Sequence, residues 1–512
     1  MIGVQLRRAG WLPGVSEADI QDRQTLTFPG LDVQIPRLTA EGVTAQVERI
    51  QAARDDYLAR LPVRRIVALL DRVASRWLDP ASPYRHEAER LLPLITGFAE
   101  PAIRKGLSAY LATLREENVL RLLEAELPEP AVLDRFAPRG RAGGETRAFG
   151  PRLTVHVWSG NVPGLPAQSL VSALLVKSAS LGKVASEEPL FATLLAESIA
   201  EVDPRLAECL AVTYWPGGDA VVEPLAFGQA DAVIAYGSER AMEHIRGRVP
   251  GHARFVAYGH KLSFGAIGRE ALSPERFADT VDRAAYDVAK YDQQGCLSPH
   301  LFYVESGGPA SPREFAEALS GSLEGYAAGV PRGRLSLEEA ASLATIRQRH
   351  ELREVAGDAV ALFSNNGGMV LFDTDAAFQA SCLNRAIWVK PVTDLVDDVP
   401  RLAGPVRRFL QTCGVAADAS RARALAEALG RLGLDRVCPL GRMADVAPTW
   451  HHDGRFTLLE LLRWTDLEPD ASAGRWEFAH PDLGLYGSAS QHVSADEEAS
   501  HSAGRGELRH DR

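Results

Sequence analysis

The middle of the chain alternates short apolar segments with amphipathic ones, and this alternation constrains the fold more than any other feature. Short apolar segments predict strands, and the segments between them, with apolar residues at helical spacing, predict helices. The predicted strands lie near residues 153–158, 181–185, 210–215, 231–236 and 254–257, and the predicted helices near residues 166–177, 189–202, 219–226 and 238–247. Strict alternation of this kind is typical of a parallel sheet with helices on both faces. The sequence therefore predicts an α/β fold built on a doubly wound sheet.

The loops after four of these strands are expected to face one crevice, because such sheets bind ligands at the carboxyl ends of their strands. These loops are residues 158–164, 186–189, 216–219 and 237–239. They are rich in residues that expose backbone N–H groups or cap helices, which suits an anionic ligand. No Gly-x-Gly-x-x-Gly motif follows any of the strands, so the common motif for holding a dinucleotide is absent.

A cysteine lies in a turn between a predicted helix and a predicted strand. Apolar residues recur at helical spacing over 277–288, and the apolar run 300–304 predicts a short buried strand. Cys296 lies between them, directly after Gly295, which allows another chemical group to come close to the backbone. This position suits a nucleophile. Free cysteine is also among the most buried residue types, so the local pattern leaves a packing role open.

Length, charge and cysteine usage exclude several classes of protein. A chain of 512 residues is too long for one hydrophobic core, so two or three domains are expected. The net charge of −11, without a basic stripe, argues against a nucleic-acid partner. The five cysteines include no Cys-x-x-Cys pair, which argues against a disulfide framework or a thiolate zinc site. No apolar run is long enough to span a membrane and no signal peptide is evident, so we expect a cytoplasmic protein.

The regions that flank the alternating segment have their own patterns. Amphipathic helices are predicted over residues 44–126, and a Pro/Gly-rich joint follows at 127–144. Residues 1–40 fit either a small β element or an arm. The second half again mixes helices with strands, with capping boxes that begin at Ser311 and Ser336.

Three motifs in order resemble one known family. They are Ser159-Gly-Asn-Val-Pro-Gly164, Asp292-Gln-Gln-Gly-Cys-Leu-Ser-Pro299 and Trp450-His-His-Asp-Gly-Arg455. Together they resemble the acyl-CoA reductase family of the LuxC type, whose best-known member is the fatty acid reductase of bacterial bioluminescence, within the aldehyde dehydrogenase superfamily. The likeness runs from about residue 149 to 468. It implies an aldehyde-dehydrogenase-like α/β fold, with two doubly wound domains and an N-terminal helical region, in a homo-oligomer.

The resemblance implies a reaction at Cys296. The cysteine matches the nucleophile of the family, and a thiolate both attacks a thioester readily and leaves readily afterwards. Asn161 matches the residue whose amide, with the Cys296 backbone N–H, holds the developing oxyanion. Local sequence alone fits equally well an asparagine that turns the chain after a strand. The implied activity is reduction of fatty acyl-CoA, or of another acyl thioester, to fatty aldehyde.

The resemblance also implies a nicotinamide cofactor. Lys183 matches the lysine that meets the adenosine ribose, and Gly237 and Ser238 match the turn under the pyrophosphate. Ser186 stands where NAD-preferring relatives often have a glutamate. A hydroxyl can donate a hydrogen bond to the 2′-phosphate that a carboxylate would repel, so NADPH is predicted. The neighbouring Glu187 works against this preference.

One departure from the superfamily bears on the reaction. Hydrolytic aldehyde dehydrogenases have a glutamate that activates water where this chain has Ala257. The departure favours acyl-CoA reduction over an NAD(P)-dependent aldehyde dehydrogenase that forms acid. A cofactor-free acyl-transfer subunit stays open as a second alternative. Proton transfer by His260 or Lys261 stays open beside solvated roles. The acyl donor also stays open between coenzyme A and a partner acyl-protein synthetase or carrier.

The motif at residues 450–455 is interpreted as a segment that closes the crevice. Adjacent side chains at His451, His452 and Asp453 diverge, and no further ligand cluster has suitable spacing, so no metal is predicted. With the family likeness, five parts are expected. They are a mainly helical region at 1–140, a dinucleotide-binding domain at 141–269, a catalytic cysteine domain at 270–445, a closing segment at 446–486 and a disordered tail at 487–512.

Overall fold

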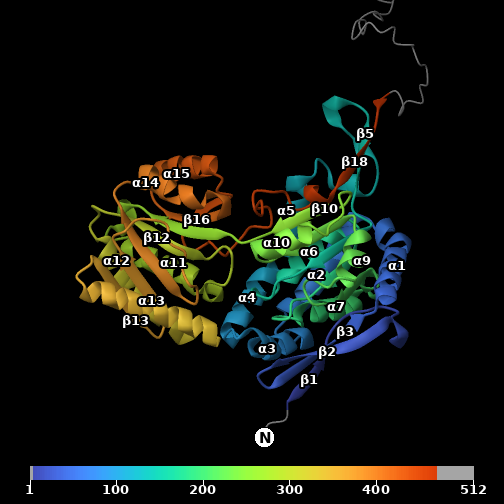
Figure 1. Cartoon of the computed structure of the whole chain (residues 1–512). Helices are drawn as coiled ribbons and strands as arrows, with labels where there is room; N and C mark the ends of the chain where they lie inside the picture. Colours follow the sequence, from blue (N-terminus) through green and yellow to red (C-terminus); the bar gives the residue numbers. More distant parts are fainter. Residues whose placement is uncertain (1–3, 470–512) are drawn as a thin grey trace, which may run out of the picture. The chain divides into compact units, whose positions relative to one another are not determined.

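The first of two large sheets contains the strands that the alternating pattern predicts (Figure 1). The computed structural model describes residues 4–469. The sheet has the order β10-β9-β6-β7-β8, and all neighbours in it are parallel. Its strands are β6 (Leu153–Val157), β7 (Ala179–Lys183), β8 (Leu210–Thr213), β9 (Ala232–Tyr236) and β10 (Arg254–Tyr258). The predicted doubly wound parallel sheet is confirmed.

Helices cover both faces of this sheet, which explains why β6, β7, β8 and β9 are buried along almost their whole length rather than at alternate residues. On one face α6 and α7 contribute Leu170 and Phe191 to a large core. On the other face α1, α9 and α10 contribute Val47, Phe227 and Ile245 to a second core. The helices that connect the strands are α6 (Leu165–Leu175), α7 (Phe191–Val202), α8 (Pro204–Ala207), α9 (Val222–Gly228) and α10 (Glu239–Arg246).

The second large sheet has seven strands in the order β13-β14-β15-β12-β11-β16-β17. The hairpin β13–β14 is antiparallel, and the other neighbours are parallel. The strands are β11 (Leu262–Ile267), β12 (Pro299–Glu305), β13 (Val360–Asn365), β14 (Gly368–Asp373), β15 (Ala386–Val392), β16 (Leu410–Ala416) and β17 (Arg436–Pro439). β11 belongs to this sheet although it precedes residue 270.

Helices cover this sheet too. The cores on its two faces contain residues of α11 and α12 and residues of α14 and α15, respectively. Both predicted capping boxes are present, at Ser311 for α12 and at Ser336 for α13. The helices are α11 (Phe277–Ala289), α12 (Pro312–Gly329), α13 (Leu337–Val355), α14 (Leu395–Ala403) and α15 (Ala419–Leu432).

The N-terminal region combines a small sheet with helices. Its first residues form a sheet of order β1-β3-β2, which decides between the predicted β element and an arm. Trp77 of α2 donates a hydrogen bond of 2.8 Å to Ser198 of α7 and so ties this region to the first large sheet. The elements are β1 (Gln5–Arg8), β2 (Ile20–Phe28), β3 (Leu31–Leu38), α1 (Ala40–Asp56), α2 (Val63–Leu78), α3 (Pro83–Thr96), α4 (Glu100–Ala112) and α5 (Glu116–Glu126).

Three short strands flank the two large sheets in the sequence. They are β4 (Ala137–Pro138), β5 (Glu145–Phe149) and β18 (Arg463–Leu467). Within the described chain, residues 138–145 and 467–469 form a small unit distinct from the rest. The predicted tail at 487–512 and the end of the predicted closing segment lie outside the described residues. Among residues 4–469, no helix has both the length and the apolar character that a membrane crossing requires.

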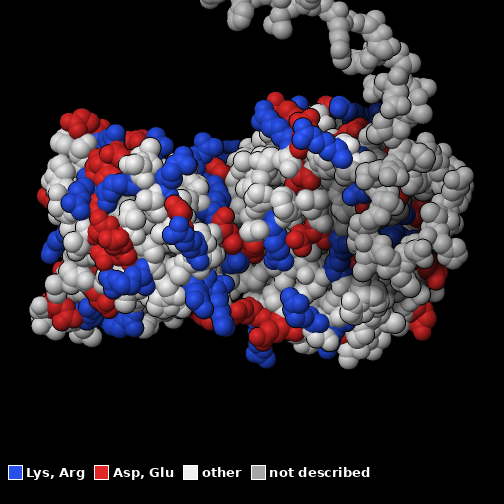
Figure 2. Space-filling model, turned by 90° about the horizontal axis from the view of Figure 1, so that it is seen from above, with Lys and Arg blue, Asp and Glu red and all other residues white. Residues whose placement is uncertain are grey.

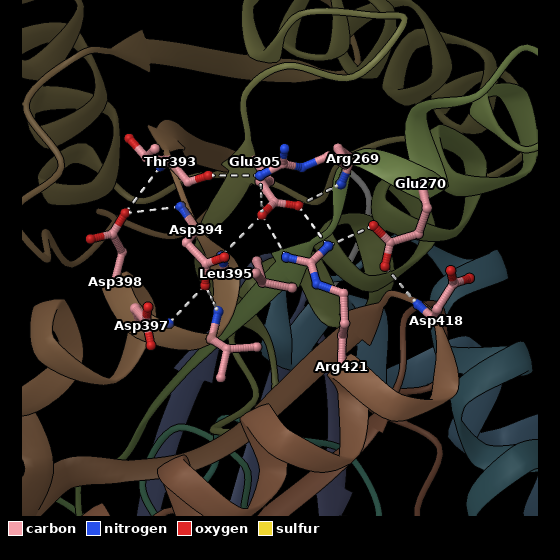
Figure 3. Close-up of polar contacts among 11 residues, drawn as sticks. Arg269, Glu270, Glu305, Thr393, Asp394, Leu395, Asp397, Asp398, Asp418 and Arg421 are labelled. Carbon is pink, nitrogen blue, oxygen red and sulfur yellow. Dashed lines mark hydrogen bonds and ion pairs between the residues drawn. The ribbon is translucent and has the colours of Figure 1, made fainter.

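A buried ionic network closes the carboxyl end of the second sheet (Figure 3). The carboxylate of Glu305, the last residue of β12, is fully buried and pairs with Arg269 at 2.9 Å and with Arg421 of α15 at 2.5 Å. It also accepts a hydrogen bond from the backbone N–H of Leu395 at the start of α14. Burial opposes ionisation, but the bonds from Arg269 and Arg421 outweigh it and lower the pKa of Glu305 to about 2. The network holds α14 and α15 against the sheet.

Ion pairs on the surface contribute little to the stability of the fold compared with the network around Glu305. Figure 2 shows acidic and basic side chains interspersed on the face in view. Ion pairs between exposed side chains typically contribute less than about 1 kcal/mol each. Removing the buried carboxylate of Glu305 has a larger effect, since Arg269 and Arg421 then both lose the acidic partner that they share.

We therefore expect Glu305→Gln to lower the free energy of unfolding by about 3 kcal/mol at neutral pH. Because the folded-state pKa lies below the ordinary value, the stabilisation is complete above about pH 5 and is lost as the pH falls toward 2. Urea unfolding of both proteins at several pH values, followed by circular dichroism, measures this. Glu354→Gln on the exposed surface of α13 is the control. Equal unfolding midpoints for Glu305→Gln and wild type at pH 7 would contradict the assignment.

Candidate active site

One cavity of about 1180 Å³ contains all the residues that the sequence proposed for the site. The loops that follow β6, β7, β8 and β9 line it, as predicted for the carboxyl ends of these strands. The loop before β12 and the segment after β17 complete its wall. The predicted residues in its lining are Asn161, Lys183, Ser186, Gly237, Ser238 and Cys296.

The loop that carries Cys296 is strained and firmly held. Tyr291, Asp292 and Gln293 all have positive φ values, of 52°, 49° and 63°. Such conformations cost about 1–3 kcal/mol each in residues other than glycine. The buried ion pair of Asp292 with Arg385, at 2.6 Å, holds the loop in place. The hydroxyl of Ser263 donates to the carbonyl oxygen of Cys296 at 2.8 Å. These contacts fix the position of the cysteine at the cavity.

The Cys296 thiol is a weak acid in this environment. The residue is partly exposed, and it lines the cavity. Burial of the thiol raises its pKa to about 11, and the negative charge of Asp453 adds to this. A hydrogen bond with Gln411 and the charge of Lys261 act in the opposite direction. Because the thiolate is the reactive form of cysteine, Cys296 would act as a nucleophile only after its thiol had lost the proton.

Asn161 links the loop after β6 to the cysteine loop. Its Nδ2 donates to the carbonyl oxygen of Gln294 at 2.9 Å, two residues before the cysteine. Its Oδ1 accepts a hydrogen bond from Ser159 at 2.7 Å, which fixes the amide plane. The amide nitrogen has two hydrogens, so the bond to Gln294 leaves one. The Asn161 side chain therefore lies next to the cysteine loop and has one N–H left that can donate a hydrogen bond.

The other end of the cavity suits a dinucleotide. Lys183 lies at the end of β7, and burial lowers the pKa of its ammonium group while Glu223 and Glu187 raise it. Ser238 caps α10, because its hydroxyl accepts a hydrogen bond from Ala241 at 3.3 Å. Gly160 permits close packing of two loops, since a Cβ there would lie 2.9 Å from the backbone N of Glu188. An ammonium group and a helix N-terminus in one cavity fit a pyrophosphate and its ribose.

The segment at residues 450–453 forms part of the cavity wall. The His452 ring stacks on Tyr258 of β10 with centroids 4.1 Å apart, and on Trp450 at 4.6 Å. Asp453 has a φ of 52° and a side chain that is 4% exposed. Within the described part of the chain, no group of three or more His, Cys, Asp or Glu side chains is arranged to hold a metal ion.

Two residues of the wall were not selected from sequence as site residues. Gln411 lies on β16, and its Nε2 donates to Oδ1 of Asp453 at 2.5 Å. The available signal for Gln411 was a pair of polar residues, Gln411 and Thr412, in a buried strand that is otherwise apolar. Asp453 belongs to a motif that the sequence did flag, but as a structural segment. Neither residue is near Cys296 in sequence, so only the fold brings them together.

The fold is that of the aldehyde dehydrogenases. The aldehyde dehydrogenase KauB of Pseudomonas aeruginosa superposes with a TM-score of 0.71 at 15% identity, over 90% of this chain and 96% of that one. An indole-3-acetaldehyde dehydrogenase of P. syringae, solved with NAD⁺, gives a TM-score of 0.70 at 15% identity, over 90% and 96%. The class that this comparison defines is therefore a fold class, that of aldehyde-dehydrogenase-like α/β proteins.

Within this class the sequence identifies the family. The model of the acyl-CoA reductase (LuxC) family matches residues 58–464, so the chain belongs to that family. A long-chain acyl-protein thioester reductase of Aliivibrio fischeri is 25% identical over 413 residues, 80% of this chain and 83% of the relative. Long-chain acyl-protein thioester reductase 2 of Photobacterium leiognathi is 24% identical over 86% of this chain and 89% of the relative. The resemblance seen in the three motifs is confirmed.

The pKa of Cys296 leads to a prediction for the free protein. Alkylation of Cys296 by iodoacetamide is expected to accelerate about tenfold per pH unit between pH 7 and 9, because the thiolate fraction grows in this way below the pKa. Peptide mass spectrometry at each pH measures the rate at this position. The urea-unfolded chain is the control, and its rate should level off near the ordinary cysteine pKa. A plateau below pH 8 in the folded protein would show that the thiol is already ionised.

Proposed function

We propose that this protein reduces long-chain acyl thioesters to aldehydes with NADPH, through a covalent acyl-enzyme at Cys296. The observation that carries the proposal is that Cys296 and Lys183 line one cavity together with an apolar wall. Membership of the acyl-CoA reductase family supports it, as do the relatives named long-chain acyl-protein thioester reductases.

In the proposed reaction the Cys296 thiolate attacks the carbonyl carbon of the thioester. Asn161 Nδ2 and the Cys296 backbone N–H donate hydrogen bonds to the oxyanion, and one such donor contributes about 3 kcal/mol to transition-state stabilisation. The carbon–sulfur bond to the donor breaks and its thiol leaves. NADPH, when bound, supplies the hydride that reduces the acyl group. Expulsion of the Cys296 thiolate from the reduced carbon then releases the aldehyde.

The wall of the cavity next to α4, α5 and α6 suits a fatty chain. Burial of each methylene of such a chain contributes about 0.8 kcal/mol to binding. Thioesters of coenzyme A and of a partner acyl-protein present the same carbonyl to Cys296, so both donors fit the proposal. The apolar residues of this wall are Leu114, Val119, Leu122, Leu165 and Val171.

The cofactor preference rests on the loop after β7. Ser186 and Glu187 both line the cavity and both are exposed. The hydroxyl of Ser186 favours a phosphate group in the ligand, and the carboxylate of Glu187 opposes it. Arg240 of α10 lies in the same lining and adds a positive charge that suits a 2′-phosphate. The hydroxyl of Ser186 and the guanidinium group of Arg240 in the lining of this cavity favour NADPH over NADH.

The nucleophile is tested with radiolabelled palmitoyl-CoA. Wild-type protein is expected to form a stable adduct on Cys296 that NADPH discharges as aldehyde, whereas Cys296→Ala should lose aldehyde formation by a factor on the order of 10⁴ or more. Cys382→Ala is the matched control, because that cysteine is also partly exposed but is not among the residues that line the cavity. Aldehyde formation by Cys296→Ala at the wild-type rate would refute the proposal.

The cofactor preference is tested by a reciprocal pair of variants. Ser186→Glu is expected to raise KM for NADPH by about tenfold or more, with a smaller effect for NADH, because like charges placed together cost several kcal/mol. Glu187→Gln should lower KM for NADPH. Initial rates with both nucleotides measure these changes. An unchanged ratio of kcat/KM values in both variants would show that this loop does not select the cofactor.

A further inference from the structure

Asp453 is a buried carboxylate in the wall that also presents Cys296. Its side chain is 4% exposed, and its Oδ1 accepts a hydrogen bond from Gln411 at 2.5 Å. It projects from the segment after β17, whereas the glutamate of hydrolytic relatives would project from the position of Ala257 on β10. The structure thus supplies a carboxylate to the cysteine from a different part of the chain.

Gln411 lines the cavity together with Asp453 and Cys296. Its side chain is fully buried, and its Nε2 donates a hydrogen bond to Asp453. The amide must turn its NH₂ group toward the ionised carboxylate, because its oxygen cannot donate. The Gln411 Oε1 atom then has no hydrogen-bond partner although it is buried. The Gln411 amide keeps this orientation only if its hydrogen bond to Asp453 stabilises it by more than the unpaired Oε1 atom costs.

Other groups near the cysteine suit proton transfer less well. Burial lowers the pKa of His300 to about 4, and its Nδ1 accepts a hydrogen bond from the backbone N–H of Ser381 at 3.1 Å. The His452 ring is sandwiched between two aromatic rings, and burial lowers its pKa to about 3. Imidazoles with such values are weak bases at neutral pH. Burial raises the pKa of Asp453, which brings it closer to the range in which a proton is exchanged efficiently.

Several charged groups face Asp453 and set its behaviour. Lys261 Nζ lies 3.9 Å from Asp453 Oδ1 and 3.1 Å from Asp435, so one ammonium group serves two carboxylates. Arg455 adds positive charge, and Asp435 adds negative charge. Burial raises the pKa of Asp453, and the charges of Lys261 and Arg455 act in the opposite direction.

We propose that Asp453 is the catalytic residue that moves the proton of Cys296 during acylation, with Gln411 as its positioning residue; this rests on the proposed function. Asp453 takes the proton as the S–H bond breaks and the sulfur attacks the acyl carbon. The protonated carboxyl group then gives that proton to the thiolate of the departing donor, which leaves as a thiol. The carboxylate is restored, and the only covalent change is transfer of the acyl group to Cys296.

The test compares two reactions of the same thiol. In Asp453→Asn, loss of the negative charge lowers the thiol pKa, so alkylation of Cys296 by iodoacetamide at pH 8 should become several-fold faster. Single-turnover acylation by palmitoyl-CoA should nevertheless become slower by about 100-fold, because the proton acceptor is gone. A residue that acts only through its charge would accelerate both reactions. Asp435→Asn is the matched control, since it removes the other carboxylate on Lys261 and should leave acylation within about threefold of wild type.

Each remaining outcome also decides. Unchanged or faster acylation in Asp453→Asn overturns the assignment. Normal acylation with slower release of free palmitate also overturns it, because Asp453 would then be a group that activates water. If both reactions of Asp453→Asn are slow, Asp453→Glu decides: acylation at least tenfold faster than in Asp453→Asn supports the assignment, and an equal rate overturns it. A wild-type protein that alkylates at Cys296 but is not acylated by palmitoyl-CoA overturns the proposed function, and this assignment with it.

Discussion

Burial of a thiol that must ionise is the constraint on which the rest of the site depends. The cavity around Cys296 raises the thiol pKa to about 11, so the reactive thiolate is scarce in the free protein. The surroundings of the cysteine offset this cost in part, through the hydrogen bond from Gln411 and the charge of Lys261. A cysteine that is protonated until substrate binds is protected from unwanted alkylation and oxidation. It then requires a proton acceptor in the cavity wall.

A second requirement is that the cysteine loop stays fixed although it is strained. Three consecutive non-glycine residues with positive φ precede Gln294, and the buried pair of Asp292 with Arg385 holds them. The hydrogen bond from Asn161 to Gln294 joins this loop to the first sheet, from which the cofactor end of the cavity is built. The residues proposed as nucleophile and oxyanion donor, and the loops proposed to hold the cofactor, are thus fixed relative to one another by these contacts. Such preorganisation lowers the entropic part of a reaction barrier.

Local patterns predicted most of the fold, because the strands and connecting helices of the first sheet are short segments with their own periodicity. The loops at 159–162 and 237–238 could be assigned to one crevice for the same reason, since carboxyl ends of parallel strands meet. The pair of Gln411 and Asp453 could not be found in this way. Their contact joins β16 to a segment beyond the last strand of the sheet, and nothing in either local pattern encodes it. The left-handed backbone at Asp292 is likewise held by a distant partner, Arg385.

The central claim is that the acyl group on Cys296 leaves by reduction. The most direct measurement is to isolate the acyl-enzyme, add NADPH carrying deuterium at the transferred C4 position, and analyse the released product by mass spectrometry. The account predicts aldehyde with one deuterium at C1, formed at the rate at which the acyl group disappears from Cys296. Release of unlabelled fatty acid, or an acyl-enzyme that persists with NADPH in excess, would contradict it.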